Sequence, residues 1–113
     1  MTLLAALGDW LLAFALTQLV EAPIYRRAAG ASWPVALAAS ALTHPVVWFG
    51  FPALLEARVG YWPMVLAAEL FAVGVEGLWL RHAQVAHPAR WSIVANAASL
   101  CTGLGLRQCF GWP

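Results

Sequence analysis

Long apolar stretches alternate with short polar breaks along this chain. Each stretch is about 16 to 23 residues long, close to the ~20 residues with which an α-helix crosses a hydrocarbon layer about 30 Å thick. Arginine concentrates in the breaks, together with Gly30, Gly60 and Pro88, and such helices would end there. The pattern predicts an all-α fold, a four-helix transmembrane bundle that forms a single integral membrane domain over residues 1–113. Its predicted spans are residues 3–25, 33–55, 61–80 and 91–106.

Composition supports a lipid environment. The chain is 63% hydrophobic and only 10% charged, whereas about a quarter of the residues in a soluble protein are charged. The net charge of +1 is too small to favour nucleic acid as a partner. The sequence has no glycine-rich phosphate loop and no Ser/His/Asp or Cys/His constellation. We therefore expect the lipid bilayer as the main partner, no cofactor and no enzymatic activity.

The distribution of arginine predicts an orientation. Positively charged residues are enriched in loops that face the cytoplasm. The breaks after the first and third stretches are therefore predicted to be cytoplasmic, with both termini outside. Short loops of this kind are typical of the bacterial inner (cytoplasmic) membrane. The two predicted cytoplasmic loops hold Arg26, Arg27, Arg81 and Arg90, and the opposite side holds Arg58 and Arg107.

Two segments of the chain resemble each other. Glu21 is followed by Arg26 at the same spacing at which Glu76 is followed by Arg81. The second stretch carries Ser40 and Thr43, and the fourth carries Asn96 and Ser99 at the same mutual spacing. The glutamates are 55 residues apart and the second pair of motifs 56 residues apart. This pattern predicts two similar helical hairpins, residues 1–60 and 61–113, related as a parallel internal repeat about an axis along the membrane normal.

Ionisable side chains lie inside the apolar stretches. Glu21, Glu69 and Glu76 each fall within a predicted span, where a charge at the bilayer centre costs roughly 2.5–3.5 kcal/mol on insertion scales. His44 and Glu69 both come out near the middle of the membrane, and an ion pair between them is one arrangement that this depth allows. The candidate residues for binding or proton relay are Glu21, His44, Glu69, Glu76 and Asn96, with supporting polar residues Ser40, Thr43 and Ser99.

Three kinds of chemistry fit this set. Carboxyl groups and an imidazole can pass protons along a chain of neighbouring sites. Two or three carboxylates with an imidazole can bind a divalent metal, but the Glu-x-x-His spacing of four-helix carboxylate sites is missing, so we predict no metal site. Protonated carboxyl groups can also simply donate hydrogen bonds between helices.

Two classes of function follow from these alternatives. The first is a small transporter or channel-like protein, in which a buried Glu/His/Asn layer serves the movement of protons or a cation. The second is a non-catalytic small subunit that packs within a larger membrane protein complex. Because four helices alone provide a thin pathway, we expect a homo-oligomer or a larger assembly.

Overall fold

The computed structural model describes residues 2–111, and this part of the chain is all-helical, without strands. Four long helical stretches follow one another. The first is α1 (Leu3–Pro23), which continues into a π-helical turn (Ile24–Ala28). The second is α2 (Trp33–Pro45), extended by two π-helical segments (Val46–Gly50 and Pro52–Glu56) and the short α3 (Ala57–Val59). The third is α4 (Tyr61–His82) and the fourth is α5 (Pro88–Phe110).

Three of these stretches are long and apolar enough to cross a membrane: Leu3–Ala28, Trp33–Val59 and Tyr61–His82. The fourth, α5, is 23 residues long but carries more polar side chains, so the described residues yield three candidate spans rather than the expected four. Several of the polar residues of α5 point into the protein rather than outward, Ser92 and Asn96 being almost fully buried. Some of the side chains that lower the apolar character of α5 are thus used for packing, whereas Arg90, Arg107 and Gln108 near its ends are exposed.

Local sequence signals explain where the helices begin. The Thr2 hydroxyl accepts a hydrogen bond from the backbone N–H of Ala5 (3.1 Å), and the Ser32 hydroxyl accepts one from Val35 (3.4 Å). These are N-cap interactions, which satisfy donors that a helix start leaves free. Between α3 and α4, Gly60 adopts a φ of +87°, a conformation that side chains other than glycine rarely adopt. The chain can therefore reverse direction there without a longer loop.

Proline marks the places where the helices widen. Pro23 is the last residue of α1, and Pro45 is the last residue of α2. A π-helical segment follows directly in both cases. Proline has no backbone N–H to donate and clashes with the preceding turn, and a wider turn accommodates it without breaking the helix. The second stretch consequently remains continuous past Pro45.

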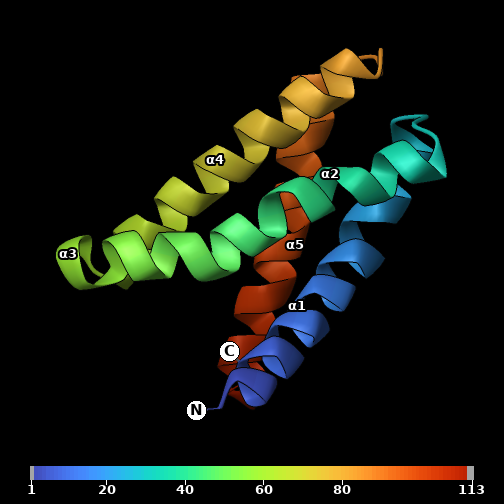
Figure 1. The fold of residues 1–113 in the computed structure, drawn as a ribbon. Coiled ribbons are helices and arrows are strands. Elements are labelled where there is room, and N and C mark those ends of the chain that lie inside the picture. The colour runs from blue at the N-terminus through green and yellow to red at the C-terminus, as the bar shows by residue number, and fades with distance from the viewer. Residues whose placement is uncertain (1, 112–113) are drawn as a thin grey trace.

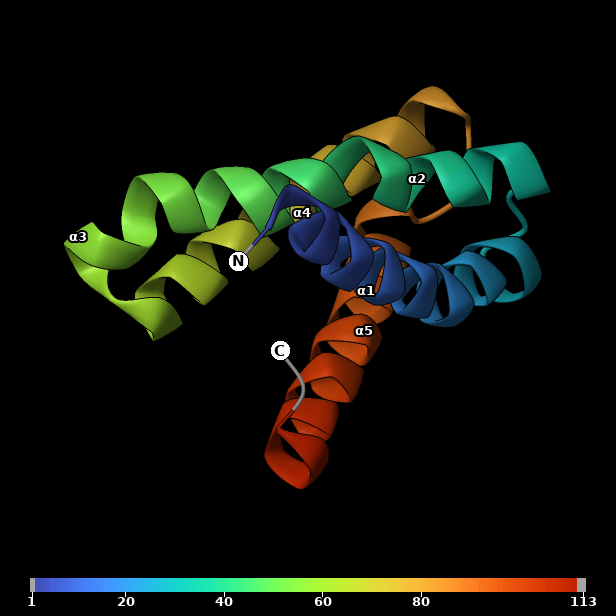
Figure 2. The ribbon, with the colours of Figure 1, turned by 60° about the horizontal axis from the view of Figure 1, so that its bottom comes forward.

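The helices form a ring in which each packs mainly against two neighbours: α1 against α2 and α5, and α4 against α2 and α5. The connections from the first stretch to α2 and from α4 to α5 lie at the same end of the molecule (Figure 1). We call this end the loop end. The start of α1 and the end of α5 both lie away from the loop end (Figure 1). Towards its last turns, α5 runs away from α2 and α4 (Figure 2).

Most of the buried core lies towards the loop end. Tyr25, Ala36, Ala39, Leu80 and Ala95 are at or near zero exposure. Alanine dominates this core, so the helix backbones can approach closely, as in small-residue interfaces of membrane proteins. Beyond this layer the helices separate, and we call the opposite end of the bundle the open end.

Candidate functional site

Glu21 lies on the first helix at the closed part of the bundle, and 2% of its surface is exposed. One carboxylate oxygen accepts a hydrogen bond from the Ser40 hydroxyl on α2 (2.7 Å). The other accepts a short hydrogen bond from the Ser99 hydroxyl on α5. A single side chain of α1 therefore joins the two helices that flank it.

Glu76 occupies the corresponding place on α4, with 1% of its surface exposed. Its Oε1 atom accepts hydrogen bonds from the Tyr25 hydroxyl (2.6 Å) and the Asn96 amide (3.2 Å). Its Oε2 atom accepts one from the Thr43 hydroxyl (2.7 Å). Side chains from all four helices thus meet around Glu21 and Glu76, and we call this set the carboxyl network: Glu21, Tyr25, Ser40, Thr43, Glu76, Asn96 and Ser99.

The network has a regular pattern. Each glutamate accepts one hydrogen bond from the partner helix of its own hairpin, Ser40 for Glu21 and Asn96 for Glu76. Each also accepts one from the second helix of the other hairpin, Ser99 for Glu21 and Thr43 for Glu76. These pairs are the ones that the repeat hypothesis relates to each other. Their equivalent roles support that hypothesis, although the position of Tyr25 in the first hairpin is occupied by Leu80 in the second.

The donors of the network are neutral. Within residues 2–111, no arginine or histidine forms an ion pair or a hydrogen bond with Glu21 or Glu76. The two acidic groups lie close enough to interact electrostatically. Two neighbouring carboxylates without a cation repel each other, and sharing a proton or holding a cation would relieve that repulsion.

His44 does not pair with Glu69 in the described structure, so the midplane ion pair that the sequence allowed is not formed. The Nδ1 atom of His44 instead accepts a hydrogen bond from the indole N–H of Trp10 (2.9 Å). The imidazole also stacks on Trp48, with ring centroids 6.0 Å apart and an angle of 14° between the ring planes. Because an indole N–H can only donate, Nδ1 must be unprotonated, and the proton of a neutral His44 is then on Nε2. Sequence spacing gave no sign of this aromatic partner on α1.

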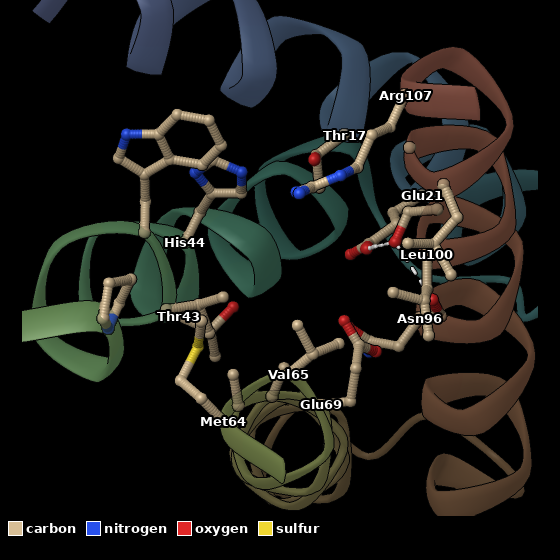
Figure 3. Close-up of a pocket in the computed structure, with 18 of the residues that line it drawn as sticks. Thr17, Glu21, Thr43, His44, Met64, Val65, Glu69, Asn96, Leu100 and Arg107 are labelled. Atoms are coloured by element: carbon tan, nitrogen blue, oxygen red, sulfur yellow. Dashed lines mark hydrogen bonds between the residues drawn. The ribbon is translucent and has the colours of Figure 1, made fainter. Parts of the chain in front are cut away.

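Glu69 lies on α4 two turns before Glu76, but its surroundings differ. It is half-buried, and none of the hydrogen bonds among residues 2–111 reaches its carboxylate. It lines a cavity of about 350 Å³ that also reaches Glu21, Glu76 and Asn96. Figure 3 shows Glu69 and His44 on different sides of this hollow.

The cavity extends from the carboxyl network to the open end of the bundle. At one extreme it touches the carboxyl network, and at the other it is lined by Glu56, Tyr61 and Arg107. These three residues lie at the ends of their helical stretches that are far from the loop end. The remaining wall is largely aliphatic or aromatic. It includes Val47, Trp48, Met64, Val65, Leu100 and Leu104.

The structure brings most of the candidate residues together. Glu21, Glu76 and Asn96 share the network with Ser40, Thr43 and Ser99, while Glu69 and His44 line the cavity beside it. Sequence reasoning missed Tyr25, a fully buried hydroxyl donor. Its position four residues after Glu21 places both on one face of a helix, and that spacing is the signal that could have found it.

In the part of the chain that the structure describes, no group of three or more His, Cys, Asp or Glu side chains is arranged to hold a metal ion. Comparisons with protein-family models, curated proteins and solved structures find no match to this chain. The argument for function therefore depends on the geometry of the network and the cavity.

Proposed function

We propose that this protein is a small multi-pass membrane transporter or channel-like protein that moves protons or a cation. In this proposal the chain crosses the bilayer four times as two repeated hairpins, with the loop end in the cytoplasm and both termini outside. The membrane is the bacterial inner membrane. Three apolar helices of sufficient length and the arginines of the two loops support this arrangement.

The observation that carries the proposal is a cavity that joins the open end of the bundle to a buried pair of carboxyl groups. Ionisable groups inside a membrane protein are costly and commonly mark pathways for ions or protons. Here the cavity offers a route by which water or a solute reaches such groups. At the loop end, the buried layer around Tyr25 and Leu80 closes the bundle, which corresponds to a state open to one side only.

Each acidic residue has a distinct role in the proposed mechanism. Glu69, which has no hydrogen-bond partner among the described residues, is the first carboxylate that a cation or proton meets beyond the mouth at Glu56. Glu21 and Glu76 form the inner site, where the neutral donors around them stabilise the charged carboxylate form. Movement towards the loop end requires the hydrogen bonds that the two glutamates accept across the hairpins to open: Thr43 and Tyr25 to Glu76, and Ser99 to Glu21.

A second candidate is a small subunit of a larger membrane complex. It is favoured by the divergence of α5 from α2 and α4 (Figure 2) and by large apolar side chains exposed along α5, such as Ile93 and Phe110. A partner helix or a second copy of the chain would cover this surface. In that case the cavity is a gap that the partner fills.

Proteoliposomes separate the two candidates. The purified chain is reconstituted with a pH-sensitive dye inside, and proton entry is recorded after an imposed pH gradient with a potassium shunt. We expect flux with the natural chain, loss of flux in Glu69→Gln and unchanged flux in Asp9→Asn, an acid-to-amide change outside the cavity lining. Absence of flux together with stoichiometric co-purification of a larger membrane protein would instead establish the subunit.

A further inference from the structure

The walls of the cavity have an uneven distribution of charge. Four glutamates line it, Glu21, Glu56, Glu69 and Glu76, against a single arginine, Arg107. If Glu21 and Glu76 are left out of the count because they belong to the network, the lining still has two acidic side chains, Glu56 and Glu69, against one basic side chain, Arg107. A cavity with walls of one sign and low dielectric constant concentrates ions of the opposite sign. The lining therefore selects for positive charge.

Arg107 contacts an aromatic side chain at the edge of the cavity. Its guanidinium donates a hydrogen bond to the Tyr61 hydroxyl (2.7 Å), and its central carbon lies 4.3 Å from the centroid of the Tyr61 ring. These contacts hold the cation at the edge of the cavity and join the start of α4 to the last turns of α5. Arg107 is consequently not paired with Glu69, which remains the free acceptor inside.

The surroundings of Glu69 do not suit a small inorganic ion. Na⁺, Ca²⁺ and Mg²⁺ need several oxygen ligands around one point. On the helix of Glu69 the neighbouring cavity residues Val65, Ala68 and Ala72 have no side-chain oxygen. The carboxylates and hydroxyls of the carboxyl network that line the deeper part of the cavity already take part in hydrogen bonds with each other. Aliphatic walls beside a single carboxylate suit a ligand that has its own apolar body.

Aromatic rings complete this environment. The cavity is lined by the indole of Trp48, which is held in place by stacking on His44. The face of a tryptophan ring attracts organic cations such as quaternary ammonium groups. The volume of about 350 Å³ lies within the range of small-molecule sites, ~300–1,000 Å³. A bare proton or metal ion needs no such space.

We propose that the cavity is a binding site for a small organic cation, an ammonium group with an attached apolar or aromatic body, whose charge is paired with Glu69 and whose body contacts Trp48 and the aliphatic wall. This inference rests on the proposed function and specifies the class of solute that is moved. It assigns Glu69 as the charge partner and Trp48 as a specificity-determining residue.

Binding is tested by isothermal titration of the full chain in phosphatidylcholine nanodiscs, which carry no net lipid charge. The probe is benzyltrimethylammonium, and benzenesulfonate is the anionic control of similar size. We expect the cation to bind and the anion not to bind. The affinity should fall about tenfold or more in Glu69→Gln, because a charge-assisted contact is lost, and about threefold or more in Trp48→Leu. Asp9→Asn and the charge-retaining Glu69→Asp should bind within a few-fold of the natural chain.

Circular dichroism of every variant shows whether the helical fold is retained, and Glu69→Asp keeps the test valid if Glu69→Gln does not fold. Equal binding of the anion, or an unchanged affinity in a folded Glu69→Gln, would overturn the inference. The same preparations in liposomes separate the two proposals. Proton flux without binding of the organic cation refutes this inference but retains the transporter, whereas binding without any flux refutes the transporter but retains the site.

Discussion

A glutamate side chain has different surroundings in the closed part and in the open part of the bundle. Glu76 and Glu69 are two turns apart on one face of α4, yet Glu76 accepts three hydrogen bonds and Glu69 accepts none from the described residues. The three donors to Glu76 come from the first helical stretch, from α2 and from α5, which all close around it. Further along α4, where Glu69 lies, α5 separates from α4 (Figure 2) and no donor reaches the carboxylate. A buried carboxyl group is thus a structural centre where four helices meet, and a candidate binding group where they diverge.

The largest expected effect comes from replacing glutamate by glutamine separately at position 76 and at position 69. Glu76→Gln places an amide N–H₂ where the carboxylate accepted three donors, so at least one donor loses its acceptor. We expect a loss of about 2–3 kcal/mol in the free energy of unfolding, measured by titration with SDS in mixed micelles and followed by circular dichroism. Glu69→Gln should change it by less than about 0.5 kcal/mol.

That pair of variants tests the comparison directly. Glu69→Gln is the matched control, because it has the same chemistry on the same helix. Equal destabilisation by the two changes would show that the ends of the bundle do not differ in the way proposed here.

A second comparison uses threonine. The hydroxyl of Thr43 is buried and donates to Glu76, whereas Thr17 lines the cavity and has no side-chain hydrogen bond among the described residues. Thr43→Val removes the donor with almost no change in volume, and we expect a loss of about 1–2 kcal/mol. Thr17→Val should be close to neutral in the same SDS titration. A larger effect at Thr17 than at Thr43 would contradict the assignment of the network as the stabilising part.

Tyrosine provides a third comparison, with a smaller effect. Tyr25→Phe removes a buried hydroxyl that donates to Glu76 at 2.6 Å, and we expect a loss of about 1 kcal/mol. Tyr61→Phe removes an acceptor for Arg107 at an exposed contact, where water can replace it, so stability should change by a few tenths of a kcal/mol. Thermal unfolding in detergent, with both variants measured side by side, would reveal the difference. Equal melting temperatures for the two would argue against it.

The smallest expected effect concerns the relation between the two hairpins. If Thr43 and Ser99 are equivalent positions of a repeat, exchanging their side chains should preserve both hydrogen bonds. The double variant Thr43→Ser with Ser99→Thr is therefore expected to lie within about 0.5 kcal/mol of the natural chain. The matched control, Thr43→Ala with Ser99→Ala, removes both donors and should cost about 2 kcal/mol. An exchange as damaging as the control would leave the repeat hypothesis without support from the network.

Several features of the molecule could be predicted from the sequence alone. The apolar stretches have lengths close to those that span a bilayer and are separated by polar breaks, and this pattern predicted helices at the positions where they are found. The spacing of Glu21 and Glu76 relative to their partners predicted one polar layer drawn from all four helices. Such inferences succeed because helical periodicity and the cost of buried charge act locally along the chain.

Other features depended on how the helices cross. The sequence placed His44 and Glu69 at similar depth, but depth does not specify which face of α2 meets which face of α4. In the folded protein His44 bonds to Trp10 on α1, and Glu69 faces a cavity. The sequence also treated all three glutamates as equivalent candidates.

The sequence by itself determined that helices form and roughly where they end. It also placed acidic side chains within apolar helices, where they have to be buried between helices rather than exposed to hydrocarbon. Only the tertiary structure decided that Glu21 and Glu76 are surrounded by hydrogen-bond donors and that Glu69 faces the cavity. The physical reason is that hydrogen bonds between helices require atoms within about 3 Å of each other. That proximity is set by where all four helices converge and where they diverge, which no local pattern of residues encodes.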